Sequence, residues 1–212
     1  MVVLDAELSG RHVRLEPLRQ QHAPGLAIAG AADPELYRLT RVPDSEEAAR
    51  QYVAAAETAR QAGTAAPFAV IRLSDQAVVG STRLFDLQQW TWPEGHPRHG
   101  HDGPDTCEIG HTWLAGSAIR TGANTEMKRL MLTLAFETWE VQSVCFHTDA
   151  RNERSRRALA RIGARYEGTL RSHRLGADGR PRNSARFAIT AADWPVVRAH
   201  LGKLSRDALL VS

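Results

Sequence analysis

The chain reads CEIGHTWLAGSAIRTGANTEMKRLMLTLAFETWEVQSVCFHT from residue 107 to residue 148. Its two ends, 107–114 and 143–148, are rich in β-branched and aromatic residues and predict two strands. Between them, residues 125–139 predict a helix, because apolar residues recur at helical spacing: Met127, Leu130, Met131, Leu134 and Ala135. A strand, a helix and a second strand in this order predict a parallel pair joined by a right-handed crossover.

The flanking sequence predicts further elements on both sides. Upstream we expect a strand at 11–18, a helix ending near 61 and a hairpin of strands 67–73 and 77–87. Downstream we expect a helix at 152–162, a hairpin of strands 166–175 and 183–189, and a C-terminal helix at 191–206. This order predicts an α+β fold, with a mixed, mostly antiparallel sheet of about seven strands flanked by helices. We expect one domain over 1–212, with an inserted loop at 88–105.

The composition suits a globular protein and excludes several other classes. The chain has 212 residues, of which 42% are hydrophobic and 24% charged, which argues against disorder. No apolar run is long enough to span a membrane, and the N-terminal residues lack the pattern of an export signal. Two cysteines, Cys107 and Cys145, make no disulfide framework. We expect a cytoplasmic protein, with both cysteines buried on neighbouring strands.

Positive charge is concentrated in one region. Residues 151–186 hold eleven arginines against three acids, a net charge of +8, so the rest of the chain carries −5 out of a total of +3. Such a region indicates a partner that bears phosphate, either a nucleic acid or a phosphorylated cofactor. A solvated arginine face is the alternative. Aromatic residues are too few there to stack single-stranded bases.

Residues 117–126, SAIRTGANTE, lie between the strand and the helix and predict a site for an anion. Backbone N–H groups at a helix N-terminus converge there at the positive end of the helix dipole. Gly122 allows close approach of the backbone, and Asn124 or Thr125 could cap the helix. The motif is neither a Walker loop nor a dinucleotide fingerprint. A pyrophosphate is the ligand that it suits best; an ordinary helix cap is the alternative.

Three segments together resemble the GNAT superfamily of acyl-CoA-dependent N-acetyltransferases: EIGHTWL (108–114), RTGANTE (120–126) and DARNERSRRALARIGA (149–164). The resemblance covers about residues 10–190 and is greatest to the ribosomal-protein-alanine (RimJ/RimL-type) branch. Of the three fixed positions of the family's pyrophosphate motif, Ile119, Gly122 and Asn124, only the glycine matches. Because backbone amides bind the phosphates, these departures weaken the match without removing the site.

The resemblance implies residues for binding acetyl-CoA. The backbone of Trp113 and Leu114 would hold the pantetheine arm, and Asn152 would donate a hydrogen bond to it, although each also suits a structural role. The phosphates would lie on the turn that opens the helix, formed by Arg120, Thr121, Gly122, Ala123, Asn124 and Thr125. No metal is expected.

The resemblance also implies catalytic residues. Many members place a tyrosine seven residues after the asparagine, to protonate the departing thiolate, but Leu159 stands there in this chain. Ser155 is the residue of the RimJ/RimL-type branch, and we expect it to donate a hydrogen bond to the thioester or thiolate. Glu108 is the expected base, acting through water, although it also suits a purely structural role, and His111 or a water chain is the alternative base. Strand alternation would separate Glu108 from His111 unless a bulge intervenes.

The loop at 88–105 is longer than is usual in this branch. Trp90 and Trp92 could cover the acceptor site beside His111, and we count all three as expected substrate-binding residues. His96, His99 and His101 could bind a metal, but their spacing fits no standard zinc pattern, and a solvated loop is the simpler interpretation.

The leading hypothesis is an enzyme that transfers an acetyl group from acetyl-CoA to a primary amine, on a protein N-terminus or a small molecule. The acidic remainder of the chain favours a cationic acceptor. The alternative is a catalytically silent acyl-CoA sensor, and nucleic-acid binding ranks well behind because CoA phosphates already explain a basic helix start. A homodimer through the C-terminal helix is possible, as is closure of the chain's own core by that helix.

Overall fold

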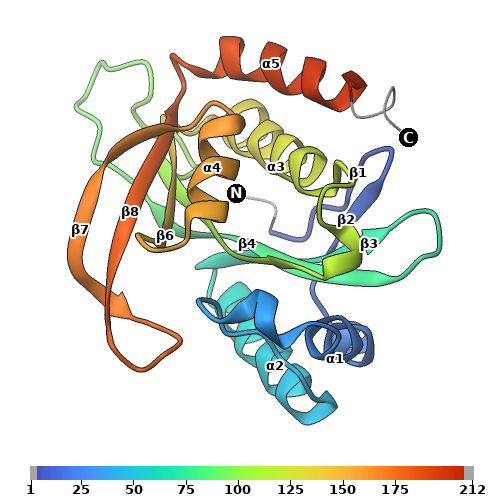
Figure 1. The fold of residues 1–212 in the computed structure, drawn as a ribbon. Helices are drawn as coiled ribbons and strands as arrows, with labels where there is room; N and C mark the ends of the chain where they lie inside the picture. The colour runs from blue at the N-terminus through green and yellow to red at the C-terminus, as the bar shows by residue number, and fades with distance from the viewer. Residues whose placement is uncertain (1–3, 208–212) are drawn as a thin grey trace.

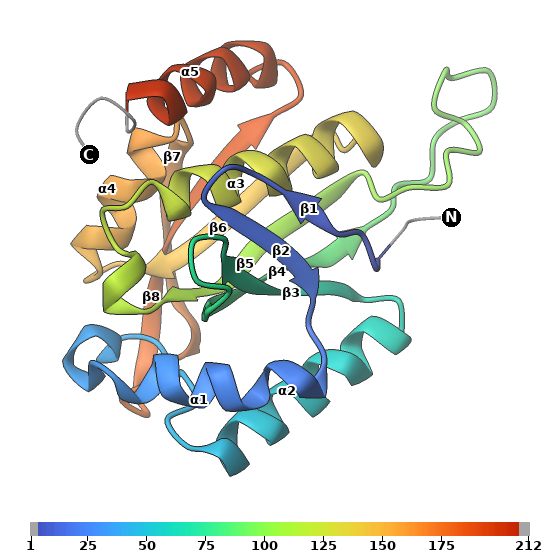
Figure 2. The same cartoon turned by 90° about the vertical axis from the view of Figure 1, so that its right-hand side faces the viewer.

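A computed structural model describes residues 4–207 as one eight-stranded sheet with helices on both faces (Figures 1 and 2). The strands are β1 Leu8–Ser9, β2 Val13–Pro17, β3 Ala65–Arg72, β4 Val78–Gln88, β5 Thr106–Leu114, β6 Ser143–Asp149, β7 Arg165–Leu175 and β8 Pro181–Thr190. The helices are α1 Ala23–Ala31, α2 Glu46–Gln61, α3 Ala123–Thr133, α4 Glu153–Arg161 and α5 Trp194–Asp207. The ends of the expected 1–212 unit, residues 1–3 and 208–212, lie outside the described residues.

The sheet confirms the predicted α+β class and its mostly antiparallel character. Its order is β1-β2-β3-β4-β5-β6-β8-β7, and only the β5–β6 pair is parallel, as the crossover predicts. The strand beyond the expected seven is β1, whose two residues are too few to show an alternating pattern.

The parallel pair separates soon after it forms. Three residues of β5, Thr106 to Glu108, pair with Ser143 to Cys145 of β6, and the register contains no further pair. A β-bulge lies in the separated part of β5: between the pairs Ser81–Trp113 and Arg83–Gly110, one residue of β4, Thr82, faces two of β5, His111 and Thr112. A bulge bends its strand and increases the local twist, which turns β5 away from β6. The sheet therefore opens at its centre.

Helices cover the two faces of the sheet in separate groups. In Figure 2, α1 and α2 lie on one face and α3 and α5 on the other, and α4 packs on β6 and β7. Trp194, Val197 and Leu201 of α5 are buried in the chain's own core. The C-terminal helix thus closes the monomer, and a homodimer stays a prediction. No helix in residues 4–207 has the length and apolar character needed to cross a membrane.

Helix α3 begins earlier than expected and is tied to the first long strand. Its N-cap is Gly122, at φ +84°, so neither Asn124 nor Thr125 caps it with a side chain. The buried Glu126 accepts backbone hydrogen bonds from Arg11 (2.7 Å), His12 (2.7 Å) and Val13 (2.9 Å). Gly10 leaves room for this carboxylate, since a Cβ there would lie 2.3 Å from its carbon. Glu126 therefore fixes the start of α3 against β2.

The segment between β4 and β5 projects from the body of the molecule (Figure 2) and contains neither helix nor strand. Asp105, fully buried at its base, accepts hydrogen bonds from Trp90 N (2.7 Å) and Trp92 Nε1 (2.8 Å). Arg98 adds an ion pair of 3.1 Å to the same carboxylate, and the Trp92 ring stacks on His96. These contacts give the loop a fixed shape around a single acid.

Candidate active site

The opening between β5 and β6 leads into a cavity of about 740 Å³. Its walls come from the separated parts of the two strands, the turn before α3, the start of α4 and the β7–β8 hairpin. The predicted site residues among its lining are Glu108, His111, Trp113, Leu114, Arg120, Gly122, Asn124, Thr125, Asn152 and Ser155. The fold thus brings together segments that the sequence places far apart.

The turn before α3 has the geometry of an anion site. The backbone of Arg120 (φ +64°) and Gly122 (φ +84°) is left-handed, and both residues line the cavity. No side chain occupies the cap position, so the first N–H groups of α3 remain available to a ligand. Thr121 and Ala123 do not line the cavity; Thr121 Oγ1 donates instead to the Ala118 carbonyl at 2.8 Å.

The start of α4 lies across the cavity from this turn. Asn152 is the N-cap, and its Oδ1 accepts from Ser155 N at 3.0 Å. Asn152 thus caps α4, and its amide nitrogen, which donates to no residue in the described part of the chain, is available to a ligand. Arg154 and Arg161 also line the cavity, and Arg161 donates to Thr125 Oγ1 at 2.7 Å. Part of the basic region is therefore directed at this site.

The end of β5 is held in place from the opposite side. The Tyr37 hydroxyl donates to the Leu114 carbonyl at 3.0 Å, and its ring makes an edge contact with the Trp113 ring. Both β5 residues are buried, as expected of core residues. Their edge toward β6 has no partner strand, so its backbone groups face the opening.

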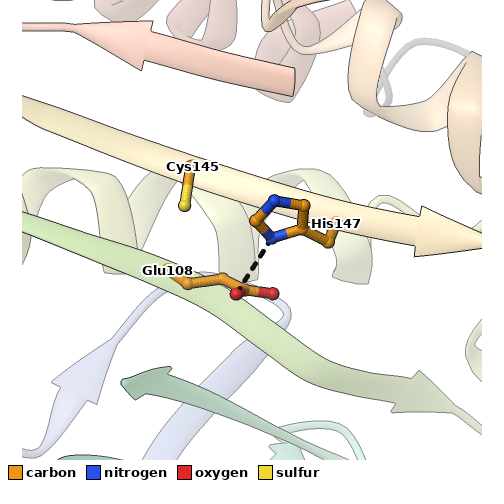
Figure 3. A group of neighbouring side chains, drawn as sticks. All are labelled: Glu108, Cys145 and His147. Atoms are coloured by element: carbon orange, nitrogen blue, oxygen red, sulfur yellow. Dashed lines mark ion pairs between the residues drawn. The ribbon is translucent and has the colours of Figure 1, made fainter. Parts of the chain in front are cut away.

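Glu108 lies where the two strands begin to separate. Its Oε2 is 2.8 Å from Arg174 Nη2 and 3.0 Å from His147 Nδ1; Figure 3 shows the Glu108 and His147 side chains directed toward each other. Burial alone would raise the pKa of Glu108, but the His147 contact and the Arg174 charge lower it overall. Glu108 is thus an ionised carboxylate at neutral pH, engaged with two partners from β6 and β7.

The same carboxylate belongs to a possible metal-ligand group. Ligand atoms of Glu108, Cys145 and His147 lie within 4.8 Å of one another. The Arg174 guanidinium forms an ion pair with Glu108 Oε2, the same oxygen that contacts His147. Its positive charge opposes the binding of a metal cation there. Burial raises the pKa of the Cys145 thiol to about 12, which also disfavours a thiolate ligand. Both cysteines are buried and free, on neighbouring strands as predicted.

His111 occupies the β-bulge, with φ +49°. The bulge removes the expected separation, and Glu108 and His111 line the same cavity. The imidazole makes an edge contact with Phe85, at 5.0 Å between ring centroids. Desolvation in the cleft, together with the Arg83 charge, lowers the pKa of His111. The ring is therefore neutral at neutral pH, and the same shift makes it a weaker base than a free imidazole.

Lys128 is a residue of this site that the sequence analysis missed. Its Nζ donates to Thr112 Oγ1 of β5 at 2.9 Å and lies 5.5 Å from the centre of the Phe146 ring on β6. It thus contacts both strands that flank the opening, from the side of α3. Burial lowers its pKa to about 7. A signal was present: Lys128, Met131 and Ala135 follow helical spacing on a buried stripe, and a lysine there is exceptional.

The long loop does not reach the cavity. Trp90 and Trp92 line no part of it, because both are directed at Asp105. The three loop histidines also have separate partners: His96 binds Arg98 N, His99 the Trp92 carbonyl and His101 the Trp139 carbonyl. Within the described residues they form no metal-ligand group.

Comparison with known proteins agrees with this geometry. Residues 12–165 match the family described as "Acetyltransferase (GNAT) domain", so the chain belongs to the GNAT acetyltransferase family, whose members use acetyl-CoA. None of the curated proteins matches the sequence significantly.

Solved structures of similar chains cover nearly its whole length. A putative acetyltransferase from T. thermophilus is 33% identical, with a TM-score of 0.76 over 96% of this chain and 98% of the other. A GCN5-related N-acetyltransferase from Brucella melitensis is 26% identical, with a TM-score of 0.76 over 94% and 86%. Mycobacterium smegmatis RimJ in complex with CoA-disulfide is 21% identical, with a TM-score of 0.76 over 95% and 94%, and this likeness concerns the fold.

Proposed function

We propose that this protein transfers the acetyl group of acetyl-CoA to a primary amine, on a protein N-terminus or a small molecule. One observation carries the proposal: a single cavity connects the uncapped N-terminus of α3, the open edge of β5 and the ionised Glu108. Anion site, extended backbone edge and carboxylate are the three parts that an acyl-CoA N-acetyltransferase requires. The resemblance in the 108–164 segments supports placement in the RimJ/RimL-type branch.

The cavity suggests how the substrate would be held. The phosphates of CoA suit the turn at Arg120 and Gly122, with Arg154 and Arg161 supplying positive charge. The pantetheine arm would pair with the open edge of β5 at Trp113 and Leu114, as an added strand does. Asn152 and Ser155 would donate hydrogen bonds to the arm and the thioester. The acetyl group would then lie in the opening between β5 and β6.

An ammonium acceptor must lose two protons, one before the attack and one, to water, as the acetamide forms, and one proton must reach the sulfur. Glu108 would take the first through a water molecule, with the neutral His111 as the alternative base. The amine nitrogen then attacks the thioester carbonyl, and the C–S bond breaks as the acetamide forms. Lys128, whose Nζ lies beside both strands at the opening, would give a proton to the departing thiolate. Lys128 would thereby replace the proton-donating tyrosine that many members of the family have at the position of Leu159.

Turnover separates this proposal from a silent acyl-CoA sensor. We expect the purified protein to release CoA and form an acetylated product, identified by mass spectrometry, with members of a panel of amines. Glu108→Gln should lower kcat by about 10²-fold or more, the usual contribution of a general base, and leave acetyl-CoA affinity nearly unchanged. The matched control is Glu167→Gln, which removes a carboxylate from an exposed ion pair with Arg186. Binding of acetyl-CoA without turnover of any amine would instead support the sensor.

A further inference from the structure

A second cavity, of about 540 Å³, adjoins the first. It lies on the α2 side of the sheet, between the residues that follow α2, strand β4 and the bulge of β5. The two cavities share His111 and Arg174 in their walls. A molecule in the second cavity would therefore reach the candidate bases from the face opposite α3 and Lys128. This is the position from which an acceptor would meet the thioester.

Arg83 of β4 lines the second cavity and is buried, with only 8% of its surface exposed. Its guanidinium carbon stands 4.9 Å from the centre of the Tyr52 ring. The side chain forms no hydrogen bond and no ion pair with any residue of the described part of the chain, and its Nε is fully enclosed without a partner. Within residues 4–207, Arg83 is thus a buried cation without a counter-ion, which contacts the face of the Tyr52 ring and whose charge acts on His111.

Burial of an unpaired guanidinium is unfavourable, because the ion loses hydration and gains no counter-charge. The other charged groups of this cavity do not compensate it. Arg174 is paired with Glu108 of the first cavity. Asp86 accepts a hydrogen bond from the Gln88 amide at 2.7 Å and forms no ion pair within residues 4–207. The planar fork of Arg83 is suited to a carboxylate or a phosphate supplied from outside.

We infer that the acceptor is a small amine that also carries an acidic group, a carboxylate or a phosphate, and that Arg83 binds this group. The amine end then lies toward His111 and Glu108, where the cavities meet. This inference rests on the proposed acetyl transfer and specifies its substrate. The sequence analysis favoured a cationic acceptor from the acidic remainder of the chain. The acceptor inferred here carries an acidic group instead, because it would contact Arg83 in the cavity and not the chain as a whole.

The test compares pairs of amines that differ only in the acidic group. The common amino acids are compared with their carboxamides, and O-phosphoethanolamine with ethanolamine, by the rate of CoA release. We expect kcat/KM to favour the acidic member of at least one pair by about tenfold or more, the effect of one charge-assisted hydrogen bond. The two series distinguish a carboxylate from a phosphate.

Variants assign any preference to Arg83. Arg83→Gln should bring the ratio within a pair close to one, mainly through KM, and Arg83→Lys should retain part of the preference. Arg50→Gln is the matched control, because it removes the same charge from an exposed side chain of α2. Thermal unfolding and acetyl-CoA affinity show whether each variant is folded.

Each outcome decides the question. Equal rates with acids and amides, or a preference that survives Arg83→Gln, would overturn the inference and leave acetyl transfer intact. If acetyl-CoA binds but no pair reacts, the same pairs are titrated calorimetrically into the protein saturated with CoA. Saturable binding of an acidic member that Arg83→Gln weakens supports the inference, and its absence overturns it. Failure to bind acetyl-CoA refutes the proposed function. The inference about Arg83 is then tested separately, by titrating the acidic amines into the protein without CoA.

Discussion

The burial of Lys128 lowers its pKa, which both destabilises the folded protein and suits this residue to the proposed proton transfer. Only two of the 27 lysine and arginine residues are lysines, and one of them is buried at the opening of the sheet. Lysine differs from arginine in that burial can bring its pKa near neutrality. With a pKa of about 7, Lys128 exists in both protonation states at neutral pH. This is the property that a group requires to give a proton to a thiolate and then recover it.

Lys128→Met should lower kcat by about 10²-fold, the scale of general acid catalysis, with acetyl-CoA affinity little changed. The kcat of the wild type should fall above about pH 7, because Lys128 is then deprotonated and can no longer act as an acid. The kcat of the variant should not show this fall. Lys203→Met, at the exposed second lysine, is the matched control. A variant with wild-type kcat and an unchanged pH profile would contradict the proton-donor role.

The same substitution should stabilise the fold. Between about pH 7 and the ordinary pKa of 10.5, the unfolded chain binds a proton at Lys128 that the folded chain does not. Stability therefore rises with pH across this interval. Methionine removes the cost of burying the charge, so the gain in Tm should be largest at pH 7 and below and should shrink toward pH 10. Each kcal/mol of added stability corresponds to roughly 2–4 °C in Tm for a chain of this size. Scanning calorimetry at several pH values measures it.

Among the helices and strands, the attachment of α3 to β2 sets the position of the proposed phosphate site. Glu126→Gln leaves an amide in place of a carboxylate that accepts three backbone hydrogen bonds. We expect a loss of about 1–3 kcal/mol in the free energy of unfolding, measured by urea denaturation. Glu47→Gln, on the exposed first turn of α2, should change it by less than about 0.5 kcal/mol. Equal values for the two variants would contradict the account of Glu126.

The elements themselves were largely predictable from the sequence, because their signals are local. Periodicity located the long strands and helices, and the crossover rule gave the parallel pair. The start of α3 was misplaced, because Gly122 caps it through backbone conformation and not through a side chain. The bulge that brings His111 beside Glu108 depends on the register between β4 and β5, which no local pattern encodes.

The site was predicted in part, and the errors have a common cause. Resemblance indicated residues on the turn before α3, on β5 and on α4, and all of them except Thr121 and Ala123 line one cavity. Trp90 and Trp92 were assigned to the acceptor site because they share a side of an extended chain, but the buried Asp105 draws both into the loop. Lys128, His147 and Arg83 were missed. Their roles arise from contacts between distant segments, and single side chains reveal little of these in the sequence.

In the molecule as a whole, the projecting loop is separate from the cavity that we propose binds acetyl-CoA. Burial would raise the pKa of Asp105, but hydrogen bonds from Trp90, Trp92 and Arg98 hold it below the usual value. Its stabilising effect is therefore present at neutral pH and lost as the pH falls through that lowered pKa. Asp105→Asn should loosen the loop and speed tryptic cleavage at Arg98, followed by gel electrophoresis.

Acetyl-CoA affinity should not change in Asp105→Asn, because none of residues 89–105 lines the main cavity. Exposed Arg157, whose partner Glu153 lies on α4, provides an internal reference site for the protease. Weakened acetyl-CoA binding in this variant would show that the loop belongs to the cofactor site after all.

We propose that the N-terminus of α3 holds the phosphates of acetyl-CoA, and calorimetric titration of acetyl-CoA into the protein measures this binding. The wild-type protein is compared with Gly122→Glu, which adds bulk and negative charge at the left-handed cap. The control is Gly179→Glu, at a left-handed glycine (φ +73°) of the β7–β8 turn with open space around it. We predict saturable binding by the wild type and the control and none by Gly122→Glu. Equal binding by all three proteins, or none by the wild type, would contradict the account.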